Sequence, residues 1–122
     1  MVVRRVRITD RATENDEWYF TTPHRIPDLP AYIKTNFIDT GLLLKNTTIK
    51  VPPGDLRRIG VLEWPDQQSY DAYYADPRIQ AYEQDKTNFY AGLPNVNVVF
   101  DHVETTDQEF DVTQYINHNS AQ

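Results

Sequence analysis

The chain of 122 residues contains no cysteine, and its four glycines are scattered. Disulfide bonds, thiolate nucleophiles and sulfur-ligated zinc or iron–sulfur sites are therefore excluded. A glycine-rich loop that could cradle a phosphate group is missing as well. Positive charge is scarce, because 12 Lys and Arg stand against 18 Asp and Glu and give a net charge of −6. We therefore expect neither a nucleic-acid nor an anionic-membrane partner, since both need clustered positive charge.

Long apolar runs are also absent. No stretch approaches the roughly 18 apolar residues of a transmembrane helix. Arg4, Arg5 and Arg7 interrupt the apolar residues at the N-terminus, which therefore resemble no signal peptide. This pattern favours a cytoplasmic location. Arg5 and Arg7 would share one face of a strand, and such a face is more often solvated than part of a site.

Local signals predict the order strand, helix, strand, strand, helix, strand, with one additional strand near the front. Two of these signals are strong. Pro52-Pro53-Gly54-Asp55 is typical of a hairpin turn, and Asp76-Pro77 is an N-cap followed by a first-turn proline. The segment Leu42–Leu44 could extend the first helix or begin the next strand. The predicted strands cover residues 2–8, 18–22, 42–51, 56–64 and 96–103, and the predicted helices cover 28–41, 66–76 and 77–92.

This order is that of a ferredoxin-like α+β fold, with an antiparallel sheet and helices on one face. The other face of such a sheet needs a cover, and a second copy of the chain is the simplest one. We therefore expect a homodimer, joined sheet to sheet through apolar residues such as Val99 and Val103. Residues 1–104 would form the domain. The polar segment 105–122 would be a disordered tail or an arm lying across a neighbour.

Residues 57–77 carry a resemblance to a known family. The run Arg57–Asp66 is a strand that ends in Glu63-Trp64-Pro65 and leads into a helix start, and Ser69–Pro77 adds a break before a second helix. This pattern resembles the dimeric α+β barrel superfamily, in particular the antibiotic-biosynthesis monooxygenase-like and stress-responsive A/B barrel groups. The resemblance extends over residues 57–103. It implies a dimeric barrel and a small organic, aromatic or polyketide-like ligand bound between sheet and helices.

The resemblance transfers residues only in part. Trp64 matches a tryptophan of the monooxygenase members, whereas Gly60 stands where some of them use asparagine. Tyr73 stands where haem-degrading members carry an axial histidine, so no haem and no other cofactor is expected. Tyr73 also matches a pocket tyrosine of polyketide cyclases. We predict that Trp64, Tyr70 and Tyr73 bind the substrate, because Tyr70 and Tyr73 share one side of the predicted helix.

His102 is the histidine with the strongest claim to a role, because it would share a strand face with Val96, Val98 and Phe100. It is either a hydrogen-bonded core histidine or a general base in the cavity, and Tyr73 is the second catalytic candidate. No histidine pair has ligand spacing, so no metal is expected. Two functions remain open. One is a cofactor-independent monooxygenase, cyclase or isomerase, and the other is a non-catalytic ligand-binding or assembly protein.

Overall fold

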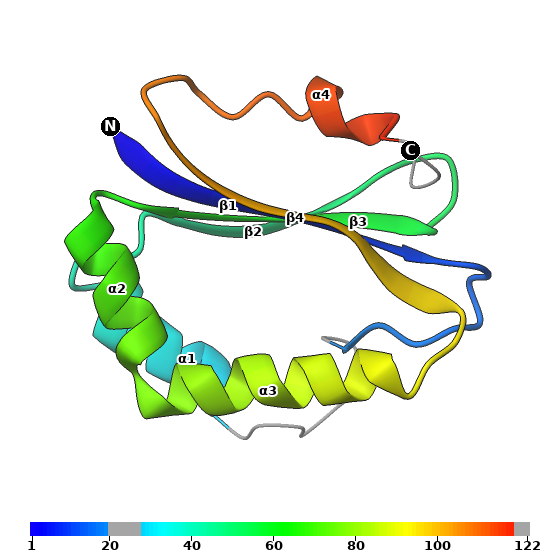
Figure 1. Cartoon of the computed structure of the whole chain (residues 1–122), viewed down its shortest axis with the longest axis horizontal. Helices are drawn as coiled ribbons and strands as arrows, with labels where there is room; N and C mark the ends of the chain where they lie inside the picture. Colours follow the sequence, from blue (N-terminus) through cyan, green and yellow to red (C-terminus); the bar gives the residue numbers. More distant parts are fainter. Residues whose placement is uncertain (20–27, 119–122) are drawn as a thin grey trace.

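A computed structural model describes residues 1–19 and 28–118 of the chain. Its strands are β1 (Val2–Arg11), β2 (Lys45–Lys50), β3 (Arg57–Trp64) and β4 (Val96–Thr106), and its helices are α1 (Leu29–Ile33, followed by a π-helical turn over Lys34–Ile38), α2 (Gln67–Ala75), α3 (Pro77–Ala91) and α4 (Thr113–Ile116). The strands pair antiparallel in the order β2-β3-β1-β4. Helices α1, α2 and α3 lie on one face of this sheet and α4 lies on the other (Figure 1). The α+β architecture is compatible with a ferredoxin-like fold.

The predicted ends of α2 and α3 are confirmed at the residues that cap these helices. The Asp66 carboxylate accepts a hydrogen bond from the Ser69 backbone N–H at 2.8 Å and begins α2. Asp76 does the same for α3, and Gly92 ends that helix. The first helix differs, because its cap residue Asp28 has φ 62° and makes no side-chain cap bond.

Each face of the sheet carries its own apolar cluster, as the alternation of β1 requires. Val3 lies on the face covered by α1–α3, which we call the helix face, whereas Val6 and Ile8 lie on the opposite, outer face. The helix-face cluster contains Val3, Leu29, Ile33, Phe37, Leu43, Trp64, Tyr73 and Ile79. The outer cluster contains Val6, Ile8, Val51, Ile59 and Val61.

The described part of the C-terminal tail covers the outer face. Phe110, Val112, Tyr115 and Ile116 pack against the outer cluster, and α4 lies over this side of the sheet (Figure 1). The expectation that all helices lie on one face is therefore wrong for α4. The tail therefore covers part of the face that a second copy of the chain was expected to cover.

The predicted strand over residues 18–22 is wrong for its first two residues. Trp18 and Tyr19 belong to no strand, and residues 20–22 lie outside the described ranges. The part of the chain that the structure describes thus has four strands. None of its helices combines the length and the apolar character that crossing a bilayer requires.

A β-bulge in the pairing of β1 with β4 changes which residues share a face. Phe100 lies opposite Ile8, whereas Val98 lies opposite Thr9. Because Ile8 and Thr9 point to opposite faces, Val98 and Phe100 do so too. The prediction that Val96, Val98, Phe100 and His102 share one face is therefore wrong. Val103 pairs with Arg5 on the helix face, so it cannot join two outer faces as we had expected.

The turn between β2 and β3 is fixed by charge. Arg58 donates two hydrogen bonds of 2.6 Å to the Asp55 carboxylate, and these hold the pKa of Asp55 at about 2. A lowered pKa means that this carboxylate stabilises the fold when the pH is above its ordinary pKa of 3.8, and that the contribution disappears as the pH falls through about 2.

Wild type should therefore be more stable than Asp55→Asn at neutral pH, and the difference should shrink on acidification. Urea unfolding of both proteins between about pH 5 and pH 2 measures this. A difference that stays constant over that range would contradict it.

Candidate functional site

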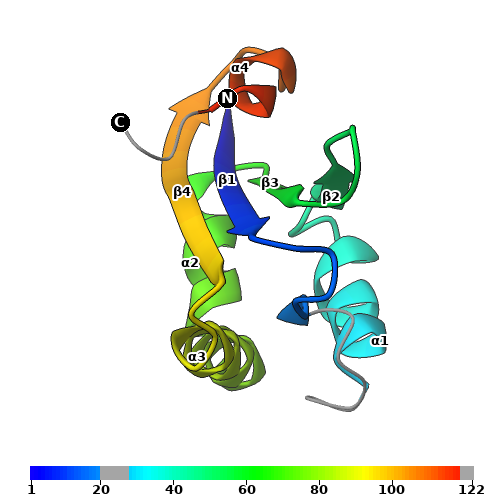
Figure 2. The same ribbon diagram turned by 90° about the vertical axis from the view of Figure 1, so that its right-hand side faces the viewer.

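A cleft of about 130 Å³ lies between the helix face of the sheet and the helices. Figure 2 shows the two sides of this layer, with α2 and α3 on the β4 side and α1 on the β2 side. Three strands and three helices supply the residues that line the cleft: Arg5, Arg7 and Thr9 of β1, Ile33 of α1, Asn46, Thr47 and Thr48 of β2, Arg58, Gly60, Val61 and Leu62 of β3, Tyr73 of α2, and Tyr82, Glu83, Lys86 and Tyr90 of α3. The cleft is thus built by elements from both halves of the chain, without a contribution from β4.

Strand and helix periodicity bring these side chains together. Arg5 and Arg7 are two apart in β1 and therefore share the helix face. On α3, Tyr82, Lys86 and Tyr90 follow at intervals of four residues and line one side of the helix. The polar residues of β1 therefore face those of α3 across the cleft.

Gly60 opens the floor of the cleft. It pairs with Arg7 on β1 and with Thr48 on β2. A Cβ atom at this position would meet nothing closer than the Arg7 backbone oxygen at 3.9 Å. A larger residue would therefore fit the strand, and its side chain would occupy the space of the cleft.

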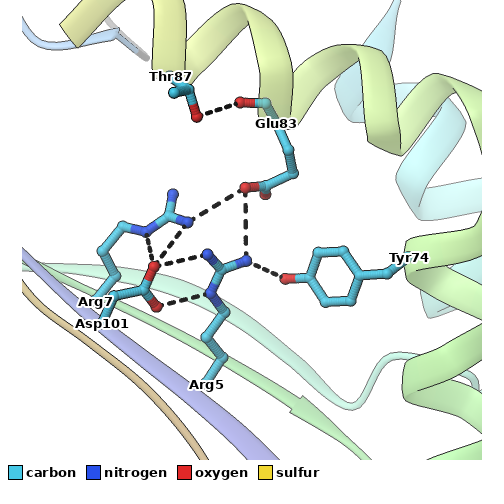
Figure 3. Close-up of polar contacts among 6 residues, drawn as sticks. All are labelled: Arg5, Arg7, Tyr74, Glu83, Thr87 and Asp101. Atoms are coloured by element: carbon cyan, nitrogen blue, oxygen red, sulfur yellow. Dashed lines mark hydrogen bonds and ion pairs between the residues drawn. The ribbon is translucent and has the colours of Figure 1, made fainter. Parts of the chain in front are cut away.

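Two arginines of β1 are tied into an ion-pair network on one side of the cleft (Figure 3). The Arg5 guanidinium donates to both Asp101 carboxylate oxygens, at 2.9 and 2.8 Å, and to the Tyr74 hydroxyl at 2.5 Å. Arg7 donates to Asp101 and to Glu83, each at 3.2 Å. The network joins β1, β4, α2 and α3, so it fixes the position of α3 above the sheet.

Several hydrogen-bond donors of the cleft have no acceptor among residues 1–19 and 28–118. They are the hydroxyls of Tyr73 and Tyr82, the ammonium of Lys86 and the Nη1 group of Arg7. Burial raises the pKa of both tyrosine hydroxyls above the ordinary value of 10.0. Both therefore remain protonated at neutral pH and act as donors. A ligand that displaces water from these groups must bring acceptors, because each buried donor left unpaired costs about 1–3 kcal/mol.

The three aromatic residues predicted from the sequence lie close together but form a packed cluster. The Trp64 ring contacts Tyr70 with centroids 4.9 Å apart and Tyr73 with centroids 5.3 Å apart, both edge to face. Trp64 is fully buried and lines no part of the cleft. Tyr73 alone of the three also lines the cleft. For Trp64 and Tyr70, a role in substrate binding stays a prediction.

His102 lies on the outer face, away from the cleft. It pairs with Val6, a residue of the outer cluster, and its ring is 6.0 Å from that of Phe100. Of the two roles considered for His102, the general base in the cavity is therefore wrong, since Asp101 is the neighbour that faces α3. No group of three metal-ligating side chains occurs within the described ranges.

The residues that sequence reasoning missed are the charged ones. Arg5 and Arg7 were interpreted as a solvated face, yet they lie opposite α3 beside the cleft. Lys86 interrupts an otherwise apolar and aromatic stripe between Tyr82 and Tyr90. A lysine inside such a stripe was the signal that could have identified it.

Comparison of the chain with protein-family models, with curated proteins and with solved structures gives no match.

Proposed function

We propose that the protein is a small-molecule enzyme whose substrate is an organic anion with a planar, aromatic or polyketide-like body. The observation that carries the proposal is the surplus of donors in the cleft. Tyr73, Tyr82, Lys86 and the Nη1 group of Arg7 offer donors that have no acceptor within the described ranges, and an enolate, phenolate or carboxylate supplies oxygen acceptors for them.

The size of the cleft favours one ring. A dry protein cavity of about 150 Å³ is known to hold benzene, and the cleft here measures about 130 Å³. The net charge of −6 would repel an anion at long range. Attraction must therefore come from the local donors, and it would act only at short distance.

Tyr73 stays a candidate for substrate binding and catalysis, but as a hydrogen-bond donor and not as a base. Because its pKa is raised by burial, the hydroxyl is a hydrogen-bond donor to a substrate oxygen and a poor base at neutral pH. The cleft and His102 lie on opposite faces of the sheet, so His102 cannot accept a proton from a ligand in the cleft.

A non-catalytic ligand-binding protein is the second candidate, because Trp64 and Tyr70 are occupied in packing. It shares the same cleft and the same ligand chemistry, and differs only in the absence of turnover. The homodimer and the cytoplasmic location stay predictions, and the remainder of the strand predicted over residues 18–22 lies outside the described residues. A sheet-to-sheet dimer would have to use the part of the outer face that the tail leaves open.

Salicylate, a planar aromatic carboxylate, is a suitable probe of the cleft. We expect wild type to bind it and Gly60→Val to bind it about tenfold more weakly or worse, because the valine side chain fills the floor of the cleft. Chemical-shift titration by NMR measures both affinities. Valine is well tolerated in strands, so the variant should fold.

Asn97→Val is the matched control, since it adds the same side chain to exposed β4 outside the cleft. It should bind salicylate as wild type does. Equal binding by Gly60→Val and wild type, or shifts that map to the outer face, would overturn the proposal.

A further inference from the structure

Lys86 differs from every other cation that lines the cleft. Arg5 and Arg7 are paired with Asp101 and Glu83, and Arg58 is paired with Asp55. Within residues 1–19 and 28–118, the Lys86 ammonium has no hydrogen bond and no ion pair. Its Nζ lies 4.2 Å from the ring centroid of Tyr82 and 5.9 Å from that of Tyr19. An amine thus stands in a half-buried aromatic setting without a carboxylate to hold its proton.

The surroundings of Lys86 favour loss of that proton. Burial is the largest effect and lowers the pKa of the amine. Arg5 on β1 lowers it further, whereas Glu83 on the same helix and Asp101 on β4 raise it, and the net direction is downward. Lys86 therefore has a larger fraction of free amine at neutral pH than an exposed lysine. A free amine, unlike an ammonium, attacks carbonyl carbon.

We propose that Lys86 is a nucleophile that forms an imine with a carbonyl group of the ligand in the cleft. The Lys86 nitrogen forms a bond to the carbonyl carbon, the carbon–oxygen bond breaks, and the oxygen leaves as water with the two amine hydrogens. No oxidant or reductant is needed. The inference rests on the proposed function, because the donors of Arg7, Tyr73 and Tyr82 must hold the oxygen atoms of the same ligand.

The ligand class follows from this arrangement. It combines a ketone or aldehyde for Lys86 with at least one further oxygen acceptor, as in hydroxyaryl aldehydes and 1,3-dicarbonyl compounds. An imine at such a carbon withdraws electrons and makes a neighbouring C–H bond more acidic. This chemistry suits the isomerase or cyclase type of reaction better than oxygenation.

Reductive trapping tests the inference on the full chain. Salicylaldehyde is added with sodium cyanoborohydride, which reduces an imine to a stable amine, and peptide mass spectrometry locates the label. The chain has four lysines, Lys34, Lys45, Lys50 and Lys86, besides its N-terminal amine. We expect Lys86 to be labelled about tenfold faster than Lys50 at neutral pH, because burial lowers the pKa of the Lys86 amine and the cleft holds the aldehyde beside it.

Two variants and one competition sharpen the test. Lys86→Arg should lose the fast label while it keeps a cation, and Lys50→Arg should keep the fast label. Salicylate, which has no aldehyde, should slow labelling of Lys86 and leave that of Lys50 unchanged.

The outcomes separate this inference from the proposed function. If Gly60→Val abolishes salicylate binding and all lysines are labelled equally, the imine is overturned and the binding site stays in place. Absence of both binding and selective labelling would overturn both.

Discussion

Trp64→Ala should lower the free energy of unfolding by roughly 3–5 kcal/mol, the range for removing a large aromatic side chain from a packed core. Trp64 is fully buried and its ring contacts Tyr70, Tyr73 and Tyr74 with centroids 4.9, 5.3 and 5.6 Å apart. Alanine would leave a cavity that these rings cannot fill without breaking their own edge-to-face contacts. Urea unfolding followed by circular dichroism measures the loss.

Trp64→Phe is the matched variant. The Trp64 indole N–H has no hydrogen-bond acceptor within the described part of the chain, so phenylalanine removes volume but no hydrogen bond. We therefore expect a smaller loss than for alanine. A loss below about 1 kcal/mol for Trp64→Ala would contradict the packed cluster and favour an open aromatic pocket at Trp64.

The element order could be predicted because its signals are local. Asp66, Asp76-Pro77 and Gly92 act within one helical turn of their own positions, and the turn over Pro52–Asp55 acts within the hairpin. The strand over 18–22 was predicted from the β-propensity of the whole run, which begins with Trp18 and Tyr19. Their rings instead pack with distant partners, such as Tyr19 against Phe89 with centroids 5.5 Å apart, so tertiary contacts outweigh propensity.

The site could be predicted only in part, because its geometry depends on register. The β-bulge beside Thr9 changes which side chains of β4 share a face, so residues before and after it no longer follow one alternating pattern. The alternation of residues in the sequence cannot reveal such a bulge. As a result Asp101, and not His102, faces α3. The apolar face of the tail could be seen in Phe110 and Tyr115, but its docking site is far away in sequence. Tyr73 lines the cleft because helical spacing places it on the side that meets the sheet, and its role in binding or catalysis stays a prediction.

Arg4→Met should cost about 3–5 kcal/mol of stability, because it leaves the carboxylate of Glu63 without its partner in a nearly buried site. The Arg4 Nε atom lies 2.6 Å from Glu63 Oε2, and the two side chains expose only 5% and 12% of their surface. Arg4 also donates to the Gln108 backbone carbonyl at 2.7 Å and lies over the Phe110 ring. Loss of Arg4 should therefore also loosen the tail from the outer face, and limited proteolysis near Gln108 should speed up.

The double variant Arg4→Met, Glu63→Met distinguishes the unpaired charge from lost packing. Removing both charges leaves no isolated carboxylate, so much of the lost stability should return, while the tail should remain loosened because the bond to Gln108 is still missing. Lys34→Ala is the control, since its pair with Asp39 is exposed and should be worth at most about 1 kcal/mol. If Arg4→Met cost no more than Lys34→Ala, Arg4 would not be the residue that holds the tail against the sheet.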